Sequence, residues 1–341
     1  MSITSATAVP SRQSTASGTG DVAIHRWNAA GPGPLVVEPR SRVDLAAWLS
    51  GNRALVGDWL DTRGAILFRG FDVATTSAFE QAASALTGAL FGEYGDLPKE
   101  HAGESVYHST PYPAHKHILF HNEASHTDRW PMKQWFYCVV APREQGETPI
   151  VDCRVVYDQL DPAVRDAFAR KRLRYVRNFV DGLDVSWQEF FKTADRGEVE
   201  RYCGAAGIDC EWRPDGTLRT SQLSPAVLRH PRTNEAVFFN QIQLHHVASL
   251  EADVRASMLE LFTEEQFPRN VTYGDGTPIP DSVVQDVTSL CWANAVALPW
   301  QERDILLVDN MLTAHARNPF VGPRKIVVAM GEMIGRHTFS F

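Results

Sequence analysis

The sequence predicts an α+β fold that is mainly β, with an antiparallel core of strands surrounded by helices. Short apolar runs of strand character occur between segments of helical periodicity, and no regular strand–helix–strand repeat connects them. Of the 341 residues, 44% are hydrophobic, which is enough for a substantial core. Neither GxGxxG nor GKS/T occurs, so neither a dinucleotide site nor a P-loop is indicated.

In the first third of the chain, each element is predicted from local pattern. Residues 1–20 are rich in Ser and Thr and predict a disordered tail. Apolar side chains at helical spacing predict an amphipathic helix over 42–63, and a glycine-bounded apolar run predicts a strand at 64–71. The Thr-Ser start of 76–90 predicts a second helix. Residues 91–118 are rich in Gly, Pro and His and predict a loop.

The rest of the chain alternates between strand and helix signals. No repeat or low-complexity linker divides residues 21–341, so a single domain is expected, with a helical and irregular insertion around 181–235. Strands are expected at 117–124, 134–140, 148–152, 235–247, 304–312 and 324–330, helices at 155–171 and 251–267, and a turn-rich connector at 313–323.

Composition excludes several classes of partner. The net charge is −8 and no basic block occurs, which argues against nucleic acid or an anionic membrane surface. No apolar run approaches the roughly 20 residues that a membrane span needs. The five cysteines show no CxxC spacing, and the first residues lack the apolar core of a secretory signal. A cytoplasmic protein with reduced thiols is therefore expected.

The stretch HNEASHTDRWP places two histidines and two carboxylates beside a strand. If the strand at 117–124 continues to Glu123, His121 and Glu123 project from the same face. A second imidazole from a distant strand would complete the triad of two histidines and one carboxylate that non-haem Fe(II) oxygenases use. His315 follows a buried strand and could supply it. His126 is five residues from His121, which does not fit the i, i+4 spacing of an HExxH zinc site.

Arg324 is predicted to face the same interior. With a period of two, it shares a face with Ile326, Val328 and Met330, whereas Lys325 points the other way. A guanidinium at the mouth of an apolar face suits bidentate capture of a carboxylate, although Arg324 could also reach water.

Five stretches, at 64–71, 119–126, 146–162, 230–246 and 306–330, together resemble the taurine dioxygenase (TauD/TfdA)/clavaminate synthase superfamily. Its members are Fe(II)- and 2-oxoglutarate-dependent dioxygenases, and the chain is most similar to their SyrP-like group of amino-acid hydroxylases. The resemblance implies a double-stranded β-helix core, also called a jelly roll or cupin-like core, flanked by helices.

The resemblance also implies a ligand set. His121, Glu123 and His315 match the residues that bind Fe(II), and Thr148 and Arg324 match those that bind 2-oxoglutarate. The carboxylate at Glu123 fills the position that related halogenases leave to halide, so oxygen insertion is favoured over halogenation.

Further roles are less closely tied to motifs. Lys325 stays an alternative to Arg324, because the interval after the last metal ligand is short for the family. Substrate contacts are expected from Tyr107, Ser109, Asn240, Gln241 and Arg317, which lie in or near the matching stretches. No acid or base role is assigned to His126 or Asp128.

The implied reaction uses Fe(II), 2-oxoglutarate and O2 to hydroxylate an unactivated C–H bond and releases succinate and CO2. The expected substrate is an amino acid or a derivative of one, free or tethered to a carrier protein, in natural-product biosynthesis. Desaturation, cyclisation and homo-oligomer formation are left open. The alternatives are a 2-oxoglutarate-independent mononuclear iron enzyme and a non-catalytic β-barrel that binds a ligand.

Overall fold

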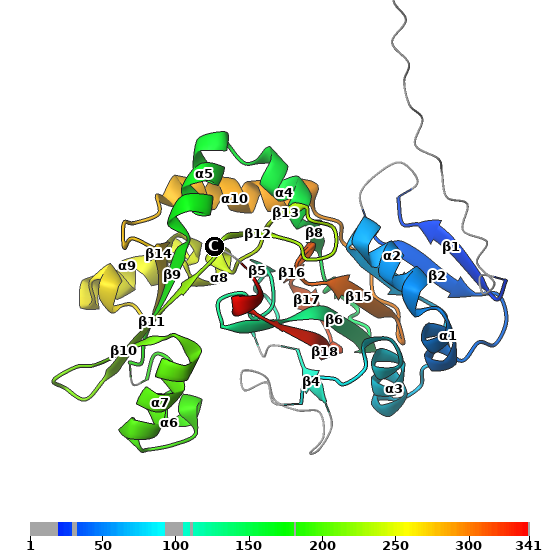
Figure 1. The fold of residues 1–341 in the computed structure, drawn as a ribbon, viewed down its shortest axis with the longest axis horizontal. Coiled ribbons are helices and arrows are strands. Elements are labelled where there is room, and N and C mark those ends of the chain that lie inside the picture. Colours follow the sequence, from blue (N-terminus) through cyan, green and yellow to red (C-terminus); the bar gives the residue numbers. More distant parts are fainter. Residues whose placement is uncertain (1–19, 29–32, 93–104, 110–111, 181, 340–341) are drawn as a thin grey trace, which may run out of the picture.

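The computed structural model confirms a fold of mixed strand and helix, with sheets at the centre and helices around them (Figure 1). It describes residues 20–28, 33–92, 105–109, 112–180 and 182–339. The predicted tail lies outside these ranges, except for Gly20. None of the helices in the described ranges is both long and apolar enough to cross a membrane.

The largest sheet of the described residues has seven strands, and the pairing between them is antiparallel except for that between β2 and β3. Across the sheet the order is β1 (Val22–Arg26), β2 (Leu35–Pro39), β3 (Ala65–Phe68), β15 (Ile305–Asp309), β6 (Arg129–Val140), β18 (Lys325–Gly335) and β4 (Val106–His108). Strands from the two ends of the chain therefore alternate at the centre of the sheet.

The remaining strands form smaller sheets. A three-stranded sheet contains β5 (Ile118–His121), β16 (Thr313–Arg317) and β8 (Ile150–Asp152), in that order. A four-stranded sheet has the order β10 (Asp209–Trp212), β11 (Leu218–Ser224), β9 (Leu173–Asn178) and β14 (Arg269–Tyr273). Two pairs complete the set, β12 (Val227–Arg229) with β13 (Ala236–Phe238) and β17 (Phe320–Val321) with β7 (Glu144–Gln145).

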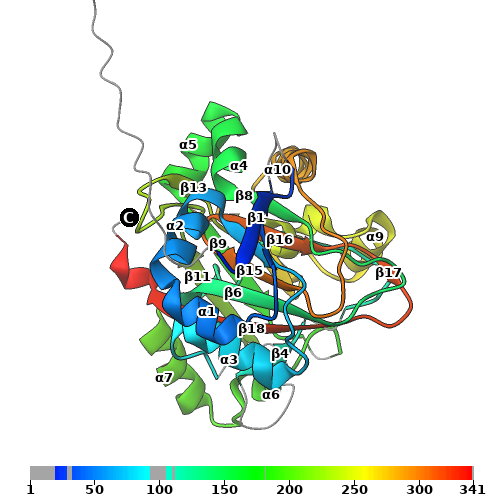
Figure 2. The same ribbon diagram turned by 90° about the vertical axis from the view of Figure 1, so that its right-hand side faces the viewer.

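Three helices cover one face of the seven-stranded sheet (Figure 2). They are α1 (Leu45–Gly51), α2 (Arg53–Arg63) and α3 (Thr76–Thr87), and they pack on strand residues such as Phe68 and Trp135. The single helix predicted over 42–63 is wrong in one respect, because Asn52 leaves the helical conformation (φ −122°, ψ 24°) and separates α1 from α2. Gly51 and Asn52 are poor helix formers, so the break costs little.

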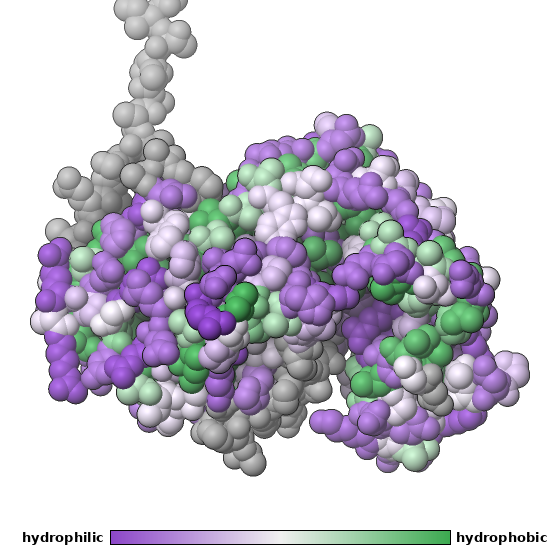
Figure 3. Space-filling view, turned by 180° about the vertical axis from the view of Figure 1, so that it is seen from behind, coloured by the Kyte–Doolittle hydropathy of each residue, from purple (hydrophilic) through white to green (hydrophobic). Residues whose placement is uncertain are grey.

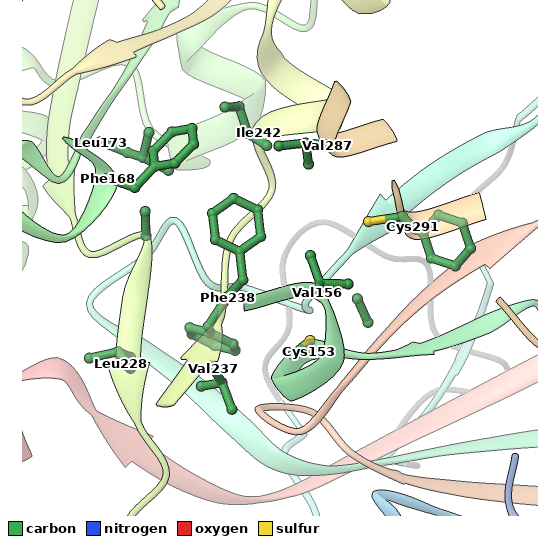
Figure 4. Close-up of a cluster of buried hydrophobic side chains, with 14 of the residues drawn as sticks. Cys153, Val156, Phe168, Leu173, Leu228, Val237, Phe238, Ile242, Val287 and Cys291 are labelled. Carbon is green, nitrogen blue, oxygen red and sulfur yellow. The ribbon is translucent and has the colours of Figure 1, made fainter. Parts of the chain in front are cut away.

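A second core lies beside the three-stranded sheet (Figure 4). It joins Val156, Phe168 and Phe238 with residues from the four-stranded sheet and from helices α4 (Cys153–Gln159), α5 (Pro162–Lys171), α8 (Ile242–His245) and α10 (Asp281–Asn294). The helix predicted over 155–171 is two helices, because Pro162 starts α5 and Asp161 caps it by accepting from the Ala163 and Val164 amides. The helix predicted over 251–267 is present as α9 (Ala252–Leu261).

Further segments differ from their predictions, beginning with the loop expected at 91–118, which contains strand β4 paired with β18. The segment at 181–235 contains α6 (Trp187–Phe191), α7 (Arg196–Ala206) and strand β11, which pairs with β9. The strand expected at 235–247 ends at Phe238 and is followed by α8. The connector expected at 313–323 begins with strand β16, because antiparallel pairing with β5 and β8 overrides its weak local strand signal.

The described residues also form three short 3₁₀ helices, η1 (Val247–Ser249), η2 (Glu264–Gln266) and η3 (Arg336–Thr338). On the face of the molecule shown in Figure 3, hydrophilic and hydrophobic residues are intermixed. Scattered apolar residues are ordinary on protein surfaces, so they do not by themselves mark an interface.

Candidate metal centre

Two histidines meet on the three-stranded sheet. His121 is the last residue of β5 and pairs directly with His315 of β16, and their ring centroids lie 4.2 Å apart. Glu123 follows two residues after His121. One possible ligand atom from each of these three buried side chains lies within 4.8 Å of the others. The structure therefore brings together the three residues predicted as metal ligands.

The two imidazoles are in a state suited to binding a cation. His121 Nδ1 lies 2.8 Å from the Leu119 carbonyl oxygen, which only accepts hydrogen bonds, so Nδ1 carries a proton and Nε2 is the ring nitrogen left for a metal. Burial, and then the proximity of His121, hold the pKa of His315 well below its usual value. Two imidazoles and one carboxylate are a donor set for non-haem Fe(II), and these residues fit that ion.

Glu123 does not lie on the strand, so the alternation of side chains along a strand does not explain why it faces the same centre as His121. The strand ends at His121, and Glu123 lies in a turn in which Ala124 has a left-handed backbone (φ 55°). Asn310 fixes this turn: its Oδ1 accepts from the Glu123 amide at 2.7 Å, and its Nδ2 donates to the Glu123 carbonyl at 2.9 Å. The expectation that the strand extends to Glu123 is wrong, although the carboxylate and His121 still converge.

A cavity opens in front of these ligands, between the three-stranded sheet and the second face of the seven-stranded sheet. Phe136 of β6 and Val328 of β18 form part of its apolar wall, and the Phe136 ring lies 4.9 Å from that of His315. Gln134, also on β6, lines the cavity and donates from Nε2 to Glu123 Oε2 at 3.2 Å. No sequence motif marks Gln134, whose only signal is a polar residue two positions before Phe136 on the same face of the strand.

Arg324 and Thr148 lie together at the same cavity. Arg324 donates from Nε to the Gly146 carbonyl at 2.8 Å and from Nη2 to Thr148 Oγ1 at 3.4 Å. Burial, and to a lesser degree the charge of Arg317, lower the pKa of Arg324 to about 10. No carboxylate of the described residues pairs with this guanidinium, which leaves a desolvated cation available to an anionic ligand. Lys325 does not line the cavity.

Two of the residues predicted to contact substrate also line the cavity, Ser109 and Arg317. The guanidinium of Arg317 donates to the carbonyls of Tyr112, Pro113 and Lys116, at 3.0, 2.6 and 2.8 Å. It is buried and has no carboxylate partner among the described residues, and burial lowers its pKa. Arg317 therefore fastens the loop before β5 and adds a second positive charge to the cavity.

The other three, Tyr107, Asn240 and Gln241, do not line the cavity. Tyr107 is buried in the sheet and donates its hydroxyl to the Phe91 carbonyl at 3.1 Å. The Asn240 amide donates to Asn122 Oδ1 at 3.1 Å, and Gln241 Nε2 donates to the Asn122 carbonyl at 3.0 Å. Asn240 and Gln241 thus hydrogen bond to Asn122 in the turn that carries Glu123, and they lie behind this turn rather than in the cavity.

The donor set has the composition of a mononuclear non-haem iron centre. Comparison with known proteins agrees. Residues 29–330 match the model of the taurine catabolism dioxygenase TauD, TfdA family. The chain is 40% identical to the dapdiamide synthesis protein DdaC of Enterobacter agglomerans over 276 residues, covering 81% of this chain and 84% of that protein.

Two further relatives extend the comparison. A clavaminate synthase-like protein of Arabidopsis thaliana is 31% identical over 290 residues, covering 80% of this chain and 82% of that protein. The crystal structure of PvcB from Pseudomonas aeruginosa shares the fold with a TM-score of 0.53 and 14% identity, covering 91% of each chain.

The chain belongs to the TauD/TfdA family of dioxygenases. It is an Fe(II)- and 2-oxoglutarate-dependent enzyme that uses O2.

Proposed function

We propose that this dioxygenase hydroxylates an unactivated C–H bond of an amino acid, or of a molecule derived from one, in natural-product biosynthesis. The relative with 40% identity is named for the synthesis of dapdiamide, which supports the biosynthetic setting. The cavity is lined by two arginines, Arg317 and Arg324. The charge of Arg317 matches the carboxylate of such a substrate, whereas Arg324 is assigned to 2-oxoglutarate. The substrate is free or tethered to a carrier protein, and the SyrP-like grouping stays a prediction.

In this proposal each cavity residue has one task. His121, Glu123 and His315 hold Fe(II), and Arg324 with Thr148 holds the far carboxylate of 2-oxoglutarate. When bound, the metal with 2-oxoglutarate and O2 supplies the oxidant that takes a hydrogen atom from the substrate, and succinate and CO2 are released.

The chain itself contributes position and a dry environment rather than proton transfer. Apolar side chains such as Phe136, Ile326 and Val328 line the cavity and exclude water from it. The seven-stranded and three-stranded sheets face each other across the cavity, and we propose that they are the two walls of a double-stranded β-helix.

The observation that carries the proposal is the Arg324 guanidinium beside the three ligands, with which no carboxylate of the described residues pairs. Its role in holding 2-oxoglutarate can be measured directly. The protein is titrated anaerobically with Fe(II) and 2-oxoglutarate while the visible charge-transfer band is recorded. Arg324→Ala is expected to weaken 2-oxoglutarate binding about 10- to 100-fold, because a charge-assisted hydrogen bond contributes about 1.5–3 kcal/mol. Lys325→Ala is the matched control and is expected to bind like the wild type.

Two results would contradict the assignment. A loss of affinity in Lys325→Ala, with none in Arg324→Ala, would transfer the role to the lysine. Equal 2-oxoglutarate affinity in Arg324→Ala and the wild type would show that this guanidinium does not hold the cosubstrate. The substrate class is then tested by incubating the loaded enzyme with free amino acids and with aminoacylated carrier proteins, and by detecting a product with one added oxygen atom by mass spectrometry.

A further inference from the structure

Gln134 occupies an unusual place for a polar side chain. It lies on the face of the seven-stranded sheet that lines the cavity and is 1% exposed. Its neighbours on this face are apolar: Val308 of β15 and Met330 of β18 lie directly opposite it, and Phe136 follows two residues along the same strand. A side chain in this setting is costly unless its amide group is fully hydrogen bonded.

The orientation of the amide follows from its partner. Gln134 Nε2 donates a hydrogen bond to Glu123 Oε2 at 3.2 Å, and of the two side-chain amide atoms only the nitrogen can donate. The amide nitrogen therefore faces Glu123, and the carbonyl oxygen Oε1 is directed away from it. Oε1 is buried and has no hydrogen-bond partner among the described residues. Gln134 is thus satisfied only at the end that contacts the predicted metal ligand.

Protein stability does not account for this residue. A buried acceptor without a partner costs about 1–3 kcal/mol, and a leucine of similar size would fit the apolar surroundings without that cost. The favourable interaction that remains is the hydrogen bond to Glu123. A buried polar group that is unfavourable for folding but well placed for a ligand indicates a functional role.

We infer that Gln134 is a positioning residue for the metal. Its amide N–H restricts rotation of the Glu123 carboxylate, so that the carboxylate is already oriented when the metal arrives. Hydrogen bonds from outer residues to ligating carboxylates contribute to metal affinity in this way. The inference rests on the proposed role of Glu123 as a ligand and adds a residue that has no counterpart among those predicted from the sequence.

The test compares metal affinity with stability in Gln134→Leu. Mn(II) is titrated into the metal-free protein, and free Mn(II) is followed by electron paramagnetic resonance. We expect the Kd for Mn(II) to rise about 10- to 100-fold. In urea denaturation without metal, we expect the variant to be as stable as the wild type or more stable. The visible spectrum of the Co(II)-loaded variant is expected to change, because the carboxylate can rotate.

Met330→Leu is the matched control, because Met330 lies opposite Gln134 in the same sheet but does not line the cavity. It is expected to leave the Mn(II) Kd unchanged. Glu123→Ala separates the two proposals: if it does not weaken Mn(II) binding, the ligand assignment itself fails. If it does, while Gln134→Leu binds Mn(II) like the wild type, only the positioning role is overturned. A loss of stability in metal-free Gln134→Leu would also overturn it, since that result indicates a structural residue.

Discussion

Asn310 is fully buried beside the cavity and illustrates how one amide can set the place of a metal ligand. Its side chain bonds to both the amide and the carbonyl of Glu123, and it also donates to the Pro131 carbonyl at 2.9 Å. The turn after β5 is thereby tied to the end of β15, where Asn310 follows Asp309. The position of Glu123 in the centre therefore depends on the hydrogen bonds between the Asn310 side chain and the backbone of this turn.

The first prediction concerns the ligand on β16. His315→Ala is expected to lower iron-dependent succinate formation at least 100-fold, because one of three metal donors is lost. The protein is expected to stay folded. His315 Nδ1 has no hydrogen-bond partner among the described residues, so removing the imidazole ring leaves no buried partner of Nδ1 unsatisfied. Succinate release and circular dichroism measure the two effects.

His25→Ala is the control, because His25 is an exposed histidine on strand β1. If His315→Ala still consumed 2-oxoglutarate, the ligand assignment would be contradicted.

Single residues differ in how far the sequence could identify them. The spacing of His121 and Glu123 and the phase of Arg324 are local properties, and the structure places all three at one cavity. Gln134 and Asn310 act through partners 11 and 187 residues away, so no local pattern reveals them. Only some of the residues expected to contact substrate line the cavity, because that depends on distant contacts too. Asn240 and Gln241 hydrogen bond to the back of the turn instead of facing the cavity.

Among the elements, the four-stranded sheet contains a juxtaposition of like charges. Arg177 of β9 lies directly opposite Arg269 of β14, and Asp184 accepts hydrogen bonds from both guanidinium groups. Burial alone would raise the pKa of Asp184, but the hydrogen bond and charge of Arg269, and then those of Arg177, outweigh it and hold the pKa below its ordinary 3.8. The carboxylate therefore links two strands that would otherwise repel each other.

The second prediction follows from this link. Asp184→Asn is expected to lower the free energy of unfolding by about 2–4 kcal/mol at pH 7, discounted from a fully buried pair because Arg269 is half-exposed. A carboxylate with a lowered pKa stabilises the folded state above its unfolded pKa. That stabilisation is lost as the pH falls from 3.8 through the lower folded value. The difference between variant and wild type should therefore narrow in acid.

Urea denaturation at pH 7 and pH 3 measures this difference. Asp209→Asn is the control, because Asp209 pairs with Arg174 in the same sheet but is 78% exposed, and exposed pairs contribute less than about 1 kcal/mol. A loss for Asp184→Asn that is equal at both pH values would contradict an electrostatic origin.

The elements also show where sequence patterns are sufficient. Helices with clear caps, such as α3 after Thr75, are found close to their predicted ranges. Two predicted helices are divided, at Pro162 and at Asn52, although the apolar periodicity continues across both positions. Pro162 cannot lie inside a helix without losing a backbone hydrogen bond, and Asn52 has a low helix propensity. Strand β16, by contrast, has only a weak strand signal in its own sequence. Its conformation comes from pairing with β5 on one side and β8 on the other.

For the whole molecule, the proposed centre lies between two sheets. The three ligands belong to β5, the turn after it and β16, whereas Arg324 immediately precedes β18 of the larger sheet. Metal and 2-oxoglutarate bound together would therefore connect the sheets. The architecture could be predicted only as a class, because the order of strands depends on pairings between distant segments.

The third prediction is that these ligands stabilise the whole fold. Mn(II) with 2-oxoglutarate, each at 100 times its Kd, is expected to stabilise the protein by about 2.7 kcal/mol or more over the metal-free state. Thermal denaturation followed by circular dichroism measures the rise in Tm. His315→Ala should show little rise, and an equal rise in that variant would place the binding site elsewhere.

The strand order has a consequence for how the protein is made. β15 and β18 flank β6, and β16 lies between β5 and β8, so residues 305–335 supply the central strands of both sheets. While the ribosome is still adding this segment, the nascent chain carries β5, β6 and β8 without these neighbours. We expect the emerging chain to need protection from aggregation until residues 305–335 have left the ribosome, and iron to be acquired only after that segment has folded.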